Sequence, residues 1–230
     1  MKTVYICGDS FAVADPEYHV DYWVSRLEQQ LLPTANVINL GRICASNLQI
    51  SLQVDDALKH GADYIVYLAT SSARDDIQFR PNQQSSSLLD RYVDLTNPDN
   101  TSDLTSVSLS YLQNSNVFDT NQIDFLTQYL LEYQPIDLAV YKNQLFIEAT
   151  LCKLQRSGIP FIFDQGGFEH SSFCGTNTQY FTEHSKYFSQ YNLWDFVDPG
   201  MPLRPYYHIT DPAVHQTVAD YYSKKILSCI

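Results

Sequence analysis

The sequence predicts an α/β protein, a three-layer α/β/α fold with a parallel, flavodoxin-like, doubly wound sheet. Four short apolar runs have the length and the β-branched or aromatic composition of buried parallel strands. These runs cover residues 3–7, 36–40, 64–69 and 160–163. Amphipathic helical segments separate them, and such strand–helix alternation indicates a parallel sheet with helices on both faces.

Capping residues predict where the helices begin and end. The first is expected to begin at Asp15-Pro16, a capping residue followed by proline at the first helical position. The second and third are expected to end at Gly61 and Gly158, because glycine commonly follows the last helical turn. The fourth is expected to begin at Asp211-Pro212. The expected helices cover about residues 16–31, 47–60, 136–157 and 212–226.

The length of 230 residues fits one domain over residues 1–230. Within it, residues 71–118 are rich in Ser, Asn, Gln, Thr and Asp and are too long for an ordinary connection. We expect an insertion over one end of the sheet, serving either as a substrate lid or as a simple polar excursion.

The charge excludes several classes of partner. With 26 acidic and 14 basic residues the net charge is −12, which disfavours nucleic acids and anionic membranes. No apolar stretch approaches the ~18–20 residues of a membrane span, and the N-terminus enters a strand-like run without a signal peptide. The five cysteines are odd in number and lack a CxxC pair, as in reduced thiols. We therefore expect a cytoplasmic protein; its oligomeric state is left open.

No cofactor or metal is expected. The sequence has neither the GxGxxG pattern of dinucleotide sites nor the GxxxxGK[ST] pattern of phosphate loops. His170 and Cys174 have a ligand-like spacing, but no second pair accompanies them.

The residues Gly8-Asp9-Ser10-Phe11 directly follow the first predicted strand. Ligands collect at the carboxyl ends of parallel strands, so these polar side chains are candidates for a site. Taken alone, they are equally typical of a turn in which Asp and Ser bind backbone amides.

Three short segments resemble the sequence blocks of the GDSL/SGNH hydrolases. Gly8-Asp9-Ser10-Phe11 resembles the first block, and Asn39-Leu40-Gly41 followed by Ala45-Ser46-Asn47 resembles the second. Tyr207-His208-Ile209-Thr210 followed by Val214-His215 resembles the last. The resemblance spans residues 5 to about 226, and a Thr-x-x-x-Arg pattern at Thr70 is similar to GDSL-like proteins of bacterial viruses.

The resemblance implies a metal-independent serine ester hydrolase. Ser10 would attack the ester carbonyl, His208 would act as the base, and the backbone N–H groups of Ser10 and Gly41 would bind the oxyanion. The substrates it implies are small acyl esters, including O-acetyl groups on carbohydrate.

The segment after the third strand departs from the family, which has an asparagine oxyanion donor there. This chain has hydroxyl groups at Thr70, Ser71 and Ser72, followed by Arg74. Any of the hydroxyls is a candidate substitute donor, Arg74 is a candidate substrate contact, and Asn47 is a further candidate for either role. Loss of one donor costs about 10²–10³ in rate.

The orienting acid is also displaced, since Pro205 occupies its family position three residues before His208. Asp195, Asp198 and Asp211 are alternatives, as is a backbone carbonyl that leaves a Ser–His dyad. Asp211 is better explained as a helix cap, and His215 as a structural residue.

Two rival functions remain. One is a catalytically degenerate SGNH-like protein that binds glycan or a partner protein through the same crevice. The other is a flavodoxin-like small-ligand module without hydrolytic chemistry.

Overall fold

A computed structural model describes residues 1–13, 22–78, 104–109, 112, 118–164, 166 and 211–230. Its centre is a four-stranded parallel sheet in the order β2-β1-β3-β6. The strands are β1 (Lys2–Cys7), β2 (Ala35–Asn39), β3 (Tyr64–Leu68) and β6 (Phe161–Asp164). The predicted fold class is therefore confirmed, with each strand within one residue of its expected bounds.

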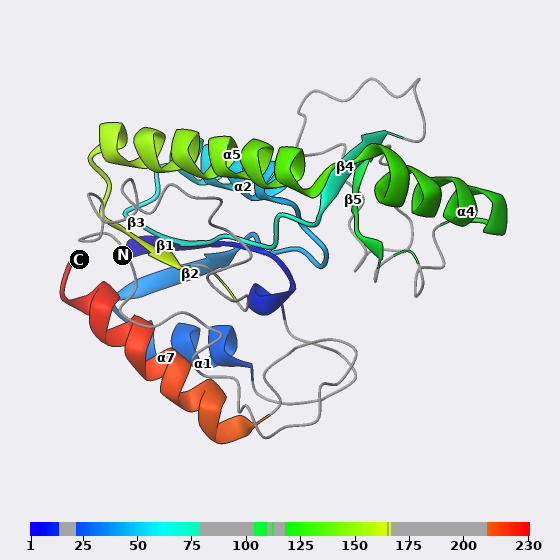
Figure 1. The fold of residues 1–230 in the computed structure, drawn as a ribbon. Coiled ribbons are helices and arrows are strands. Elements are labelled where there is room, and N and C mark those ends of the chain that lie inside the picture. Colours follow the sequence, from blue (N-terminus) through cyan, green and yellow to red (C-terminus); the bar gives the residue numbers. More distant parts are fainter. Residues whose placement is uncertain (14–21, 79–103, 110–111, 113–117, 165, 167–210) are drawn as a thin grey trace.

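Helices cover both faces of the sheet (Figure 1). One face carries α2 (Asn47–Lys59) and α5 (Ile136–Ser157), and the other carries α1 (Trp23–Leu31) and α7 (Pro212–Leu227). Successive strand residues point to opposite faces. Accordingly Val4 and Ile6 of β1 pack in one apolar cluster with α1 and α7, while Tyr5 and Cys7 pack in the other with α2 and α5.

The predicted glycine stops are confirmed, but residues 16–31 do not form one continuous helix. Gly61 and Gly158 have φ of +76° and +72°, in the left-handed region that favours glycine after a helix. The helix α1 begins at Trp23, because Tyr22 has extended backbone (φ −71°, ψ 152°). The expected start at Asp15-Pro16 lies outside the described residues.

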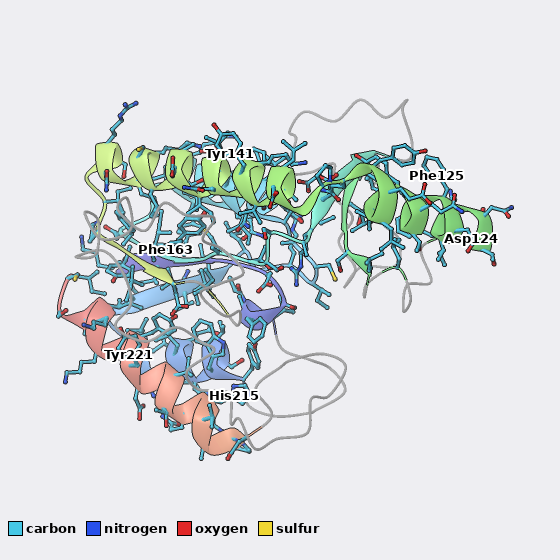
Figure 2. The ribbon with its side chains drawn as sticks, viewed as in Figure 1. Asp124, Phe125, Tyr141, Phe163, His215 and Tyr221 are labelled. Carbon is cyan, nitrogen blue, oxygen red and sulfur yellow. The ribbon has the colours of Figure 1, made fainter. Side chains whose placement is uncertain are left out.

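A smaller assembly lies beyond the edge at which the parallel strands end (Figure 1). It contains an antiparallel pair, β4 (Asp75–Gln78) and β5 (Leu104–Val107), followed by α4 (Thr120–Gln128) and the π-helical turn η3 (Tyr129–Tyr133). Its apolar cluster includes Val107, Phe118 and Leu126 and is separate from both main clusters. Phe125 on α4 and Tyr141 on α5 are largely exposed (Figure 2).

No helix in the described part of the chain is both long enough and apolar enough to cross a membrane.

Candidate active site

Ser10 lies at the carboxyl end of the central strand β1, as the sequence predicts. The chain passes Gly8 and Asp9 and enters a 3-10 turn, η1 (Ser10–Ala12), whose N-cap is Asp9. The Asp9 Oδ1 accepts a hydrogen bond from the Phe11 N–H at 3.0 Å. Ser10 is only 7% exposed. We call residues 8–12 the Ser10 turn.

Side chains from α2 and from the start of α1 hold the backbone of the Ser10 turn. The Gly8 N–H donates to Gln53 Oε1 at 2.8 Å, and Gln53 Nε2 donates to the Gly8 carbonyl at 3.2 Å. The Phe11 carbonyl accepts from Trp23 Nε1 at 2.8 Å and from the Tyr22 hydroxyl. These contacts are buried, so the turn is held from two sides of the sheet.

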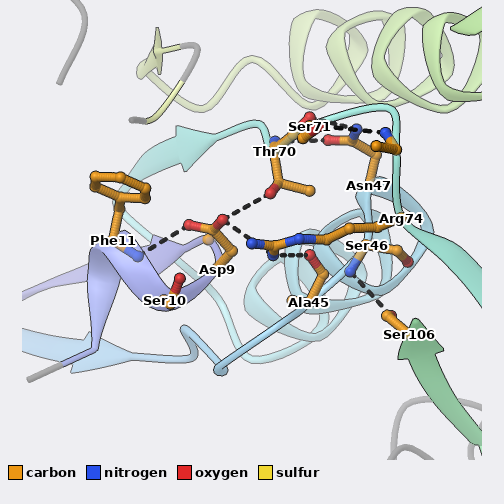
Figure 3. A network of polar contacts seen from close by, with 12 residues as sticks. Asp9, Ser10, Phe11, Ala45, Ser46, Asn47, Thr70, Ser71, Arg74 and Ser106 are labelled. Atoms are coloured by element: carbon orange, nitrogen blue, oxygen red, sulfur yellow. Dashed lines mark hydrogen bonds and ion pairs between the residues drawn. The ribbon is translucent and has the colours of Figure 1, made fainter. Parts of the chain in front are cut away.

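The carboxylate of Asp9 is the charged centre of this region (Figure 3). Asp9 has no exposed surface, and its Oδ2 accepts a hydrogen bond from the Thr70 hydroxyl at 2.6 Å. Arg74 Nη1 lies 3.0 Å from the same oxygen and also donates to the Ala45 carbonyl at 2.7 Å. A buried carboxylate is tolerated only when it is paired and hydrogen-bonded, and both conditions are met.

Ser10 itself differs from its neighbours. Its carbonyl accepts hydrogen bonds from Val13 N–H and from the Tyr22 hydroxyl. Among the described residues, neither its hydroxyl nor its N–H has a hydrogen-bond partner. The turn is therefore fixed while the two groups that acyl transfer requires from this serine are uncommitted.

Gly41 approaches the Ser10 turn closely, but its N–H is engaged. A Cβ added at Gly41 would lie 2.6 Å from the Ala12 Cβ, so only glycine fits there. The Gly41 N–H donates to Asn39 Oδ1 at 2.9 Å, while Asn39 Nδ2 donates to the Ala12 carbonyl at 2.6 Å. To bind an oxyanion, this N–H has to leave Asn39 or be shared with it.

The segment after β3 supplies positioning contacts. The Thr70 hydroxyl uses its single proton on Asp9. Asn47 holds the backbone of Thr70: its Oδ1 accepts from the Thr70 N–H at 2.9 Å, and its Nδ2 donates to the Thr70 carbonyl at 2.8 Å. Asn143 of α5 accepts from Asn47 Nδ2 at 2.9 Å and donates to the Ser72 carbonyl at 3.2 Å. Ser71 Oγ accepts from the Ala73 N–H.

The candidate base His208 and the candidate acids Asp195 and Asp198 lie outside the described residues. Asp211 is the N-cap of α7, with its Oδ1 accepting from Ala213 N–H at 2.8 Å. His215 lies on α7 (Figure 2). It is 1% exposed, and its ring packs against Tyr22 with centroids 4.8 Å apart.

The sequence interpretation missed the roles of Gln53, Asn39 and Asp164. Asp164 ends β6 and joins it to α7, since its Oδ2 accepts from the Tyr222 hydroxyl at 2.6 Å and its Oδ1 from Gly166 N–H at 2.8 Å. Burial, together with the Asp164 charge, raises the pKa of Tyr222 well above its usual value. From the sequence, Asp164 was expected to reach the same sheet edge as Ser10, either as a pocket residue or as part of a simple turn, and the contact to Tyr222 was not foreseen.

The thiol of Cys44 is a second group near this site that could act as a nucleophile. Burial raises the pKa of its thiol; the Arg74 cation acts against that shift, and Asp9 adds to it. The thiol is therefore protonated at neutral pH and does not compete with a serine. Among the described residues, no group of three or more His, Cys, Asp or Glu side chains could hold a metal ion.

Comparison with solved structures shows that the fold is that of the SGNH/GDSL esterases. The chain superposes on TesA with a TM-score of 0.54 at 10% identity, over 100% of each chain. The psychrotrophic esterase EstA from Pseudoalteromonas sp. gives a TM-score of 0.53 at 11% identity, covering 99% of this chain and 98% of that one. A protein from Desulfitobacterium hafniense, described as lipolytic and of the G-D-S-L family, gives 0.52 at 11% identity, covering 97% and 99%.

No protein-family model matches the sequence, and no curated protein matches it significantly. The resemblance to proteins of bacterial viruses has no support from these comparisons.

Proposed function

We propose that this chain is a serine ester hydrolase with Ser10 as its nucleophile. One observation carries the proposal: the turn around Ser10 is fixed by buried contacts, while the Ser10 hydroxyl and N–H have no partner among the described residues. A preorganised backbone with an uncommitted hydroxyl is what nucleophilic attack requires. The SGNH-type fold supports the same reaction class.

In this proposal Ser10 Oγ attacks the carbonyl carbon of an ester and transfers its proton to His208. The negative charge on the carbonyl oxygen is held by the N–H of Ser10 and, once it turns from Asn39, by the N–H of Gly41. The intermediate collapses as the alcohol leaves with the proton from His208, and water then hydrolyses the acyl-enzyme by the same steps. Small acyl esters, such as O-acetyl groups on carbohydrate, are the proposed substrates.

A fluorophosphonate probe tests the nucleophile without knowledge of the natural ester. We expect the purified protein to be labelled at Ser10, as identified by mass spectrometry of the peptide. It should also hydrolyse a short-chain p-nitrophenyl ester, and Ser10→Ala should abolish both signals. Labelling at another residue, or unchanged hydrolysis by Ser10→Ala, would refute the assignment.

The same assay ranks the two histidines near the C-terminal helix. His208→Ala should lose several powers of ten in kcat, because nucleophile and base act as a unit. His215→Ala should chiefly lower the unfolding temperature, because His215 is buried against Tyr22. The reverse ranking in kcat would assign the base to His215.

The alternative is a degenerate SGNH-like binding protein. It is favoured by the engagement of two candidate oxyanion donors within the protein, the Gly41 N–H by Asn39 and the Thr70 hydroxyl by Asp9. A protein that folds normally, resists the fluorophosphonate and hydrolyses no ester would be this binder.

A further inference from the structure

We infer that Arg74 is a positioning residue that cancels the charge of Asp9 beside the reacting serine. This inference rests on the proposed function, because it concerns the charge that develops during attack by Ser10. The starting observation is that the residue preceding Ser10 is a carboxylate without exposed surface.

A buried negative charge next to the nucleophile opposes ester hydrolysis. The transition state develops negative charge on the carbonyl oxygen, close to Ser10 Oγ and N–H. Repulsion between two like charges is strong where water is excluded. The Thr70 hydroxyl contributes only a dipole to Asp9, so it cannot neutralise the carboxylate.

Arg74 is the cation that balances Asp9. Its Nη1 lies 3.0 Å from Asp9 Oδ2, and its side chain is 11% exposed, so solvent screens the pair little. Figure 3 shows the guanidinium directed at the Asp9 carboxylate beside Ser10. With the pair intact, the surroundings of the oxyanion carry no net charge from Asp9.

Arg74 also joins the two segments that carry the proposed oxyanion donors. The nitrogen that faces Asp9 donates to the Ala45 carbonyl at 2.7 Å. Ala45 belongs to the loop of residues 40–46, which we call the Gly41 loop. A single guanidinium thus holds this loop against the Ser10 turn while it neutralises Asp9.

The next residue in the chain provides a matched control. Asp75 is 4% exposed and pairs with Lys142 of α5. Like the Arg74 pair, it is a buried carboxylate with a cation from another segment. Asp75 pairs with β5 and contacts α5, not the Ser10 turn. Lys142→Met therefore leaves a buried carboxylate without its cation, at a residue whose hydrogen bonds and ion pair do not involve the Ser10 turn.

The experiment measures kcat, KM and unfolding temperature for wild type, Arg74→Met, Arg74→Lys, Lys142→Met, Asp9→Asn and the double variant Asp9→Asn/Arg74→Met. We expect Arg74→Met to lose about 10²–10³ in kcat, the range for losing one oxyanion-stabilising group, with KM nearly unchanged. The double variant should recover about tenfold or more of that loss, because the unbalanced charge is gone. Arg74→Lys keeps the cation and should retain most of kcat.

The inhibition constant of a boronic acid distinguishes charge cancellation by Arg74 from a purely structural role. Phenylboronic acid forms a tetrahedral anion when boron accepts the Ser10 oxygen and the proton passes to the base. Its inhibition constant should rise in Arg74→Met in parallel with the loss of kcat, while Lys142→Met lowers the unfolding temperature and leaves the inhibition constant unchanged.

The outcomes separate this inference from the proposed function. If wild type neither hydrolyses esters nor reacts with a fluorophosphonate at Ser10, both fail. If wild type is active and a folded Arg74→Met keeps its kcat, or if Lys142→Met loses as much, only the inference is overturned. If Arg74→Met does not fold, the Asp9→Asn variant tests the inference instead. Charge cancellation predicts that Asp9→Asn lowers kcat by less than about tenfold, which is less than the loss caused by removing one oxyanion donor. A larger loss overturns the inference.

Discussion

The Ser10 turn and the Gly41 loop follow adjacent, paired strands of one sheet, yet they are held in different ways. The Ser10 turn receives buried contacts from side chains distant in sequence: Gln53 is 45 residues from Gly8, and Thr70 is 61 residues from Asp9. The Gly41 N–H is held by an exposed contact from Asn39, only two residues away.

In terms of the proposed oxyanion hole, the N–H of Ser10 is a preorganised donor, whereas the N–H of Gly41 has to break a hydrogen bond first. In the proposed mechanism the Ser10 N–H, which has no partner among the described residues, receives the oxyanion directly, whereas the Gly41 N–H has to exchange one acceptor for another. Preorganised donors cost no reorganisation at the moment of reaction, so the proposed activity should respond most strongly to changes in the Gly41 loop.

The largest effect is expected for Gly41→Ala. The added Cβ would lie 2.6 Å from the Ala12 Cβ and forces the loop away from the Ser10 turn. We expect kcat to fall about 10²–10³-fold, the loss typical of one oxyanion donor. The displaced loop also strains the Arg42 N–H contact to the Gly8 carbonyl, so the unfolding temperature should fall as well. A kcat within a few-fold of wild type would remove Gly41 from the oxyanion hole.

Gln53→Leu tests how the Ser10 turn is held. It leaves the buried Gly8 N–H without a partner, while the Gly8 carbonyl keeps its hydrogen bond from Arg42 N–H at 3.2 Å. One unsatisfied buried group costs about 1–3 kcal/mol, so denaturant unfolding should show a loss of roughly that size. Activity should fall together with stability. Unchanged stability would mean that the Ser10 turn is not held through α2.

Asn39→Ala is expected to have a smaller effect with two opposing parts. It releases the Gly41 N–H for the oxyanion, but it also removes the contact to the Ala12 carbonyl. We expect a stability loss of about 0.5–1.5 kcal/mol, the net value of one hydrogen bond. A fluorophosphonate rate constant that stays equal or rises would show that Asn39 competes with the oxyanion; a fall of tenfold or more would show that it helps to position the loop.

Asp63→Asn serves as the distant reference, at the opposite end of the sheet. The N–H of Thr3, and then the Lys2 ammonium, lower the pKa of Asp63 below its usual value. Its stabilising contribution is therefore present above the unfolded pKa of about 4 and is lost as pH falls through the lower folded value. The small difference in unfolding temperature between Asp63→Asn and wild type should vanish in acid. The kcat should match wild type at neutral pH.

Much of the scaffold could be predicted from the sequence because it depends on local patterns. The apolar runs predicted four strands, and the glycine rule predicted the end of α5 at Ser157, with Gly158 beyond it. The single helix expected over residues 16–31 was wrong, because the apolar pattern does not reveal the extended backbone at Tyr22.

The contacts around Ser10 could not be predicted in the same way. Gln53 and Asn47 lie on an amphipathic helix, and their amide groups bind the backbone of Gly8 and Thr70 at the ends of two different strands. No local spacing encodes such a contact, because it depends on how the helix packs on the sheet. The prediction of Ser10 and Gly41 relied on family resemblance, which carries the sheet geometry with it.

The contacts between Ser46, Asp76 and Ser106 have a consequence for the order of folding. Ser46 is the N-cap of α2, yet its own N–H donates to Ser106 Oγ on β5 at 3.1 Å, and its hydroxyl donates to Asp76 Oδ1 on β4 at 2.6 Å. During synthesis, residues 47–59 emerge well before Ser106. The first turn of α2 can therefore form early, but it gains its full set of partners only after the β4–β5 hairpin has paired. Because loop closure precedes the gain from such contacts, this corner of the protein is expected to consolidate late in folding.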